Sequence, residues 1–124
     1  MLKLMIVDDS NIIRRKIERT QKKSRKFELI ASASNGAEAV SMFKKFQPDV
    51  VTMDLTMPQM NGIECIKQLI AINPDILILV VSALSDKATG IEALELGARG
   101  YLCKPFTEEV LIDALQELTE DVYV

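Results

Sequence analysis

Short apolar runs alternate with longer amphipathic stretches along the chain. Uninterrupted apolar runs of this length are typical of strands that are buried on both faces, as in a parallel sheet. The pattern predicts five such strands: Leu2–Val7, Phe27–Ala33, Val50–Leu55, Ile76–Ser82 and Arg99–Cys103.

The stretches between these runs have the period of helices that bury one face. The expected buried faces are Ile12, Ile13 and Ile17; Ala39, Val40, Phe43 and Phe46; Ile63, Ile66, Leu69 and Ile70; Ala88, Ile91, Ala93 and Leu94; and Val110, Leu111, Ala114, Leu115 and Leu118. Ser10, Asn35 and Asn61 are expected helix N-caps, and the two asparagines are each followed by Glu three residues on, as in a capping box. Gly97 is expected to end the fourth helix.

Five strands that alternate with five helices predict an α/β fold of the (βα)5, flavodoxin-like type. It is a doubly wound, five-stranded parallel sheet with helices on both faces, because parallel strands require right-handed helical crossovers. We expect one domain over residues 1–124, with no output domain. In such folds ligands bind at the carboxyl ends of the strands, so we expect the functional residues to lie at these ends.

The amino-acid composition excludes several kinds of catalytic and metal site. The chain contains no histidine, which excludes Ser-His-Asp and Cys-His catalysis, histidine-ligated zinc and a phosphohistidine donor role. The two cysteines, Cys65 and Cys103, lack CxxC spacing and are expected to be small buried residues. No apolar run is long enough to span a bilayer, and Asp8 and Asp9 interrupt any signal peptide. We therefore expect a cytoplasmic protein without membrane insertion.

Charge is distributed unevenly. The net charge is −3, which argues against nucleic-acid binding. Residues 14–26 contain eight Lys and Arg residues, whereas residues 107–124 contain six Asp and Glu residues and no basic residue. Either these are two solvated helix faces of opposite sign, or they are two different docking surfaces.

Polar residues stand where the predicted strands end. Asp8 and Asp9 follow the first strand, Asp54 ends the third, Ser82 ends the fourth and Lys104 follows the fifth. In a parallel sheet these ends share one edge. Pairs of carboxylates there repel each other by about 1–4 kcal/mol at contact distance, and one Lys cannot offset three negative charges. The pattern therefore predicts bound Mg²⁺, a hard ion that takes few protein oxygens and keeps waters.

A carboxylate can attack phosphorus and form an acyl phosphate, while a divalent cation and Lys104 neutralise the phosphoryl oxygens. The Ser82 hydroxyl can donate to another of these oxygens. Asp54 is the preferred nucleophile because it lies in the middle of the group.

The chain resembles the receiver domain of two-component response regulators. The resemblance rests on four motifs that follow one another along the sequence: DD, DLTMPQMNG, VVSA and KPF. The resemblance implies strand order 2-1-3-4-5, phosphorylation of Asp54, and Mg²⁺ held by Asp9, Asp54 and the carbonyl of Thr56, with Asp8 acting through water. It also implies that Ser82 and Lys104 contact the phosphoryl group, that the Lys104–Pro105 bond is cis, and that Tyr101 follows Ser82 as a switch residue.

The same resemblance implies a monomeric signalling switch that catalyses only its own phosphoryl transfer and dephosphorylation. The donor would be a histidine kinase or a phosphotransfer protein, and a downstream protein would read the switch. Chemotaxis is the leading expectation, although the acidic last helix argues against the flagellar switch, and a phosphorelay intermediate is the second. The basic first helix suits an acidic donor surface.

The chain departs from the family pattern at a few positions. Asn61 replaces a common Asp, and Thr56 and Leu84 occupy positions that influence acyl-phosphate lifetime. Three other functions remain open: a receiver-fold binding module that is not phosphorylated, a flavodoxin-like phosphate-binding protein, and an aspartate-nucleophile phosphatase. The phosphate-binding alternative conflicts with Asp8 and Asp9 after the first strand, and the phosphatase motif requires Asp where Thr56 stands.

Overall fold

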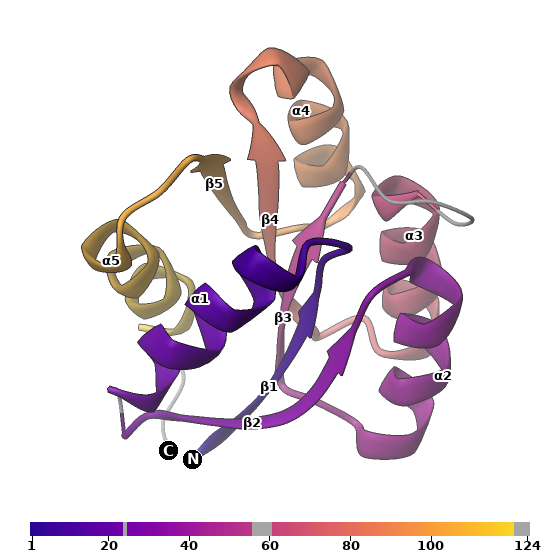
Figure 1. Ribbon diagram of the computed structural model, residues 1–124. Helices are drawn as coiled ribbons and strands as arrows, with labels where there is room; N and C mark the ends of the chain where they lie inside the picture. Colours follow the sequence, from indigo (N-terminus) through magenta and orange to yellow (C-terminus); the bar gives the residue numbers. More distant parts are fainter. Residues whose placement is uncertain (24, 56–60, 121–124) are drawn as a thin grey trace.

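The computed structural model describes residues 1–23, 25–55 and 61–120 (Figure 1). Its strands are β1 (Leu2–Val7), β2 (Phe27–Ala33), β3 (Val50–Asp54), β4 (Leu77–Ala83) and β5 (Gly100–Lys104). Its α-helices are α1 (Asn11–Lys22), α2 (Gly36–Phe46), α3 (Gly62–Ile72), α4 (Lys87–Leu96) and α5 (Glu108–Thr119), and a short 3-10 helix (Leu84–Asp86) precedes α4. Each predicted strand is present, with ends that differ by at most one residue.

The five strands form one parallel sheet in the order β2-β1-β3-β4-β5. Helices α1 and α5 cover one face, and α2, α3 and α4 cover the other (Figure 1). The predicted doubly wound fold is therefore confirmed. None of the helices found in the described part of the chain is long and apolar enough to cross a membrane.

Alternate residues of the central strands enter two separate cores. Leu4 and Ile6 of β1 pack on the α1 and α5 side, whereas Met5 and Val7 pack on the α2 and α3 side. Burial on both faces accounts for the uninterrupted apolar runs in the sequence. Cys65 lies in the second core, where burial raises the pKa of its thiol to about 12, while Cys103 is only half-buried.

Polar side chains start the helices. The side chains of Ser10, Asn35 and Asn61 each accept a backbone N–H three residues on, as predicted. The Glu38 carboxylate departs from a standard capping box, because it accepts the N–H of Ser34 at 3.2 Å, one residue before the cap. Gly97 ends α4 with a φ of 127°, a conformation that favours glycine.

Four predicted helix faces are partly wrong. Phe46 of α2 is 39% exposed and Val110 of α5 is 47% exposed. Ile12 is 79% exposed and Ile91 is 58% exposed. The buried positions of α1 are Ile17, Thr20 and Gln21, a stripe that Ile12 lies outside. In α4 the buried positions are Gly90 and Ala93. The periodicity of apolar residue types is thus an incomplete guide to which side of these helices faces the sheet.

Helices α1 and α5 are joined by an ion-pair cluster at the surface. The Glu108 carboxylate accepts from Lys23 Nζ at 2.6 Å and from Arg19 Nε at 3.1 Å. The hydrogen bonds from Lys23 and Arg19 lower the pKa of Glu108 below its ordinary value of 4.5. The charged form of Glu108 is therefore favoured in the folded protein.

The Glu108 cluster gives a pH-dependent prediction. A carboxyl group whose pKa is depressed by folding stabilises the protein above its unfolded pKa and loses that contribution as the pH falls through the folded value. We expect Glu108→Gln to lower the urea midpoint slightly at pH 7 and to have no effect well below pH 4.5. Glu109→Gln, at the exposed neighbouring position, is the control. An equal effect of Glu108→Gln at both pH values would contradict the prediction.

Candidate functional site

Four strand ends meet at one edge of the sheet. The register pairs Val7 with Met53, so that Asp8 and Asp54 follow on neighbouring strands. Asp54 is paired with Val81 of β4, and Ala83 of β4 is paired with Lys104 of β5. Parallel pairing thus brings together residues that are far apart in the sequence.

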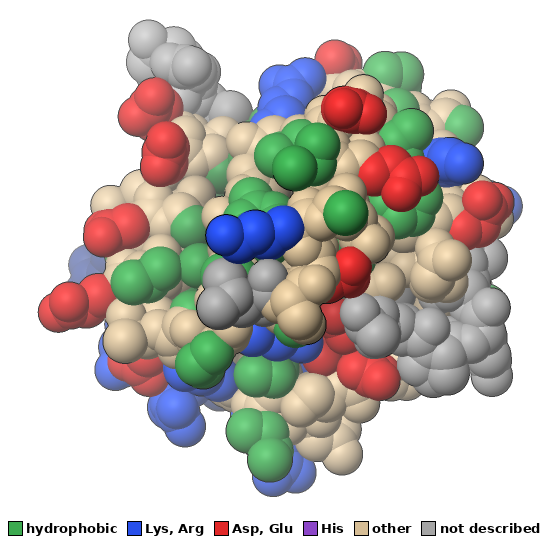
Figure 2. Space-filling model, turned by 90° about the horizontal axis from the view of Figure 1, so that it is seen from above, with side chains coloured by type: hydrophobic (Ala, Val, Ile, Leu, Met, Phe, Trp, Pro, Cys, Tyr) green, Lys and Arg blue, Asp and Glu red, His purple; other side chains and the backbone are tan. Residues whose placement is uncertain are grey.

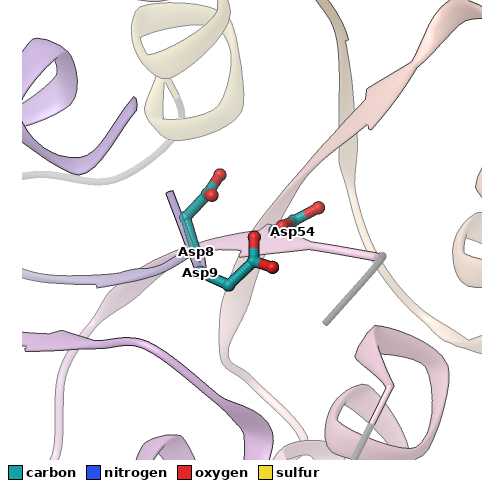
Figure 3. A group of neighbouring side chains, drawn as sticks. All are labelled: Asp8, Asp9 and Asp54. Atoms are coloured by element: carbon teal, nitrogen blue, oxygen red, sulfur yellow. The ribbon is translucent and has the colours of Figure 1, made fainter. Parts of the chain in front are cut away.

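Asp8, Asp9 and Asp54 form a compact acidic cluster. Each contributes one carboxylate oxygen, and these oxygens lie within 4.8 Å of one another. Asp8 comes from the end of β1, Asp9 from the loop that follows, and Asp54 from the end of β3 (Figure 3). Asp8 is 1% exposed and Asp54 is 4% exposed, whereas Asp9 is exposed to solvent. Figure 2 shows acidic side chains near the middle of this face of the molecule.

Lys104 supplies the positive charge next to the cluster. Its Nζ lies 3.1 Å from Asp8 Oδ2 and 3.6 Å from Asp54 Oδ1. One ammonium group faces two nearly buried carboxylates, and Asp9 adds a third negative charge. The negative charge of this group therefore exceeds its positive charge, as the sequence predicted.

Backbone contacts fix the orientation of Asp8. Its Oδ1 accepts the N–H of Ser10 at 2.9 Å, and its carbonyl accepts from Arg14 Nη1 at 2.6 Å. Its Oδ2 is buried and makes no directed hydrogen bond with any described group, although Lys104 lies beside it. A buried carboxylate oxygen with unused acceptor capacity in an oxygen-only cluster suits a hard divalent cation. The residues present therefore fit a magnesium site.

The other predicted site residues lie around this cluster. Ser82 is 1% exposed at the end of β4, and its hydroxyl donates to the carbonyl of Ala83 at 3.4 Å. Tyr101 is half-buried on β5, and the peptide bond between Lys104 and Pro105 is cis. Thr56, whose carbonyl was the expected metal ligand, lies outside the described residues.

Gly62 supports the site, a role that the local sequence does not indicate. A Cβ atom at this position would lie 2.5 Å from the carbonyl oxygen of Asp54 and 2.5 Å from Leu55 Cα. The N–H of Gly62 donates to the carbonyl of Leu55 at 3.1 Å. Only glycine allows the start of α3 to approach the end of β3 this closely. The N-cap signal at Asn61 located the helix start but not this contact.

A doubly wound parallel sheet with an acidic cluster at its strand ends is typical of receiver domains, and the comparison with known protein families leads to the same class. The profile of the response regulator receiver domain matches residues 4–116, and the chain belongs to this family. Receiver domains are phosphorylation switches rather than enzymes that turn over a separate substrate. Within the family, the chain is a CheY-like receiver.

Individual relatives support this placement. The chain is 39% identical to the chemotaxis protein CheY of Thermotoga maritima over 95% of this chain and 98% of that protein. It is 34% identical to the transcriptional regulatory protein DegU of Brevibacillus brevis, over 96% of this chain but only 50% of DegU. A chain in the crystal structure of the CheX–CheY–BeF3–Mg²⁺ complex from Borrelia burgdorferi is 28% identical with a TM-score of 0.87, over 94% of this chain and 88% of that one.

The acidic cluster predicts a stability response to magnesium. Binding only to the folded state stabilises it by about 2.7 kcal/mol at a free concentration one hundred times the Kd. We expect millimolar Mg²⁺ to raise the melting temperature, and Asp9→Asn to reduce this rise strongly. Asp113→Asn, at an exposed position of α5, is the matched control and should leave the rise unchanged. An unchanged melting temperature in the parent protein would contradict magnesium binding at this site.

Proposed function

We propose that the chain is a response regulator that accepts a phosphoryl group on Asp54 from a histidine kinase or a phosphotransfer protein. The observation that carries the proposal is the contact of Lys104 with Asp54 and Asp8 beside a third carboxylate. The reaction depends on Mg²⁺ and changes the affinity of the chain for a downstream protein. The proposed setting is the cytoplasm, with the chain acting as a monomer.

The residues divide the reaction between them. An oxygen of the Asp54 carboxylate forms a bond to phosphorus while the bond from phosphorus to the donor's imidazole nitrogen breaks, and the imidazole keeps the electron pair. Lys104 lies 3.6 Å from Asp54 Oδ1, so its ammonium group can bind an oxygen of the transferred group. The Ser82 hydroxyl, at the end of the adjacent strand, can turn from Ala83 to a second oxygen.

Asp8, Asp9 and Asp54 would hold Mg²⁺, together with the carbonyl of Thr56 as the resemblance implies. The bound ion would neutralise phosphoryl oxygens and the attacking carboxylate. Asp8 is already oriented by Ser10 and Arg14, so its carboxylate requires little reorganisation to serve as a ligand or to hold a metal-bound water. Phosphoryl transfer depends mainly on such positioning and charge neutralisation.

The donor and the downstream partner would use different surfaces. Helix α1 follows Asp8 and Asp9 and exposes Ile12 together with Arg15, Arg19 and Lys22, which suits an acidic donor with an apolar contact. Helices α4 and α5 flank a groove of about 290 Å³ whose lining includes Leu94, Arg99, Tyr101 and Glu117. Glu109, Asp113 and Glu117 are exposed on α5, so the proposed downstream partner presents basic residues there.

Chemotaxis is the proposed process, because the chain is 36–39% identical to several chemotaxis proteins named CheY over nearly their whole length. Removing the gene from its host should change the frequency of swimming reversals. The phosphorelay alternative predicts normal swimming and phosphoryl transfer from Asp54 to a second histidine-containing protein. The primary test of the function itself is the labelling of Asp54 by a small phosphodonor in the presence of Mg²⁺.

A further inference from the structure

We propose that Gly90 is a positioning residue for Tyr101: by lacking a side chain, it provides the inner site for the Tyr101 ring and so sets how often the ring occupies that site. The inference rests on the proposed function, since it concerns the regulation of the same phosphorylation switch. It assigns to one glycine of α4 the control of a residue on β5.

The contact between α4 and the Tyr101 ring carries the inference. A Cβ atom at Gly90 would overlap Tyr101 at Cε2 and would lie 2.9 Å from Cδ2 and 3.1 Å from Cζ. Three atoms of one ring would therefore be displaced by a single methyl group. Gly90 is buried and lies in the interior of a ten-residue helix, where glycine is less favourable than alanine. A packing requirement at this position accounts for the less favourable residue.

The ring is directed into the protein. Tyr101 packs against the core on the α2, α3 and α4 side of the sheet, and its hydroxyl oxygen is buried. Burial raises the pKa of Tyr101, the neighbouring Cys103 side chain raises it further, and Ser82 acts in the opposite direction. The hydroxyl makes no directed hydrogen bond with any described atom. The Cys103 and Ser82 side chains lie beside the hydroxyl, and the shape of the site at Gly90 admits the ring.

Ser82 lies beside the Tyr101 hydroxyl, whereas Gly90 lies against the face of the ring. The Ser82 hydroxyl donates to the carbonyl of Ala83 while the Tyr101 ring occupies the inner site. The missing side chain at Gly90 therefore provides space for the ring on the α4 side, apart from the space next to Ser82. Occupancy of the inner site by the ring thus depends on Gly90 as well as on Ser82.

The packing of the Tyr101 ring affects the populations of the two switch states. Phosphorylation shifts a two-state equilibrium only by its differential affinity for the two states. In the switch that the receiver resemblance implies, the inward Tyr101 ring belongs to the phosphorylated, partner-binding state. If Gly90 already favours the inner ring, that state is populated before phosphorylation, and phosphorylation adds a smaller increase. Adding a Cβ atom at position 90 should move the ring outward, lower the affinity for the partner in the resting state and widen the response to phosphorylation.

The test measures the exposure of the ring without any phosphodonor. The chain contains two tyrosines, Tyr101 and Tyr123, so Tyr123→Phe labelled with 3-fluorotyrosine gives one fluorine NMR signal. In the Tyr123→Phe background, a soluble paramagnetic agent should relax the Tyr101 fluorine signal only weakly, because the ring is held inside the protein. Gly90→Ala should increase that relaxation several-fold. Ala88→Gly, at an exposed position of the same helix, is the control for altered helix propensity and should leave the relaxation unchanged.

Each outcome decides the inference. A ring that is equally protected, or equally exposed, with and without Gly90→Ala would overturn it. If Gly90→Ala fails to fold, Gly90→Ala combined with Tyr101→Ala distinguishes the causes: folding of the double variant supports a clash with the ring, and failure to fold overturns the inference. Because no phosphoryl group is used, these results are independent of whether Asp54 is the phosphoacceptor.

Discussion

Asp54→Asn is expected to abolish labelling of the chain by a small phosphodonor in the presence of Mg²⁺. The carboxylate of Asp54 lies at the end of β3, and the ammonium group of Lys104 is 3.6 Å from its Oδ1. An amide is a much poorer nucleophile toward phosphorus than a carboxylate, so we expect the labelling rate to fall by at least about 10³-fold. Intact-protein mass spectrometry should detect one added phosphoryl group in the parent and none in the variant.

The same experiment needs a variant that keeps the nucleophile. Asp113→Asn removes a carboxylate from the exposed surface of α5 and should be labelled like the parent. Asp54→Asn should also remain folded, because it removes one of three mutually repelling charges. Labelling of Asp54→Asn on another residue would refute the assignment of the phosphoacceptor. Absence of labelling in the folded parent would favour a receiver-fold binding module that is not phosphorylated.

Much of the site was predictable because it follows from strand order in the sequence. Asp8, Asp54 and Lys104 each stand where an uninterrupted apolar run ends, and parallel pairing places such ends at one edge. Which carboxylates pair with Lys104 was not predictable in the same way. Lys104 pairs with Asp8 and Asp54, a choice that depends on the directions of side chains leaving three different strands.

Contacts between helices and the sheet were less accessible from the sequence. Ile12 and Ile91 have apolar side chains at helical spacing, yet both point to solvent, because the rotation of α1 and α4 about their axes is set by packing. Gly90 and Tyr101 lie eleven residues apart on different elements, and nothing in the local sequence indicates that they touch. Such contacts depend on tertiary packing that propensity and periodicity do not encode.

Lys104→Met is expected to destabilise the fold and to make its stability depend more strongly on magnesium than that of the parent. The Lys104 side chain is 24% exposed, whereas Asp8 beside it is almost fully buried. Removing one partner of a buried pair leaves an uncompensated charge, which costs about 3–5 kcal/mol when both partners are buried. Because Lys104 is partly solvated, we expect a loss of about 2–3 kcal/mol in the free energy of unfolding in urea at pH 7 without Mg²⁺.

The Lys104→Met result separates the electrostatic role of the lysine from its packing role. Added Mg²⁺ would neutralise the same carboxylates, so it should stabilise Lys104→Met more than the parent, and combining Lys104→Met with Asp54→Asn should recover part of the loss. Lys67→Met, at an exposed position in the middle of α3, should change stability by less than about 0.5 kcal/mol. A loss in Lys104→Met that neither Mg²⁺ nor Asp54→Asn reduces would mean that Lys104 contributes through the packing of its stem, and that the acidic cluster does not require a compensating cation.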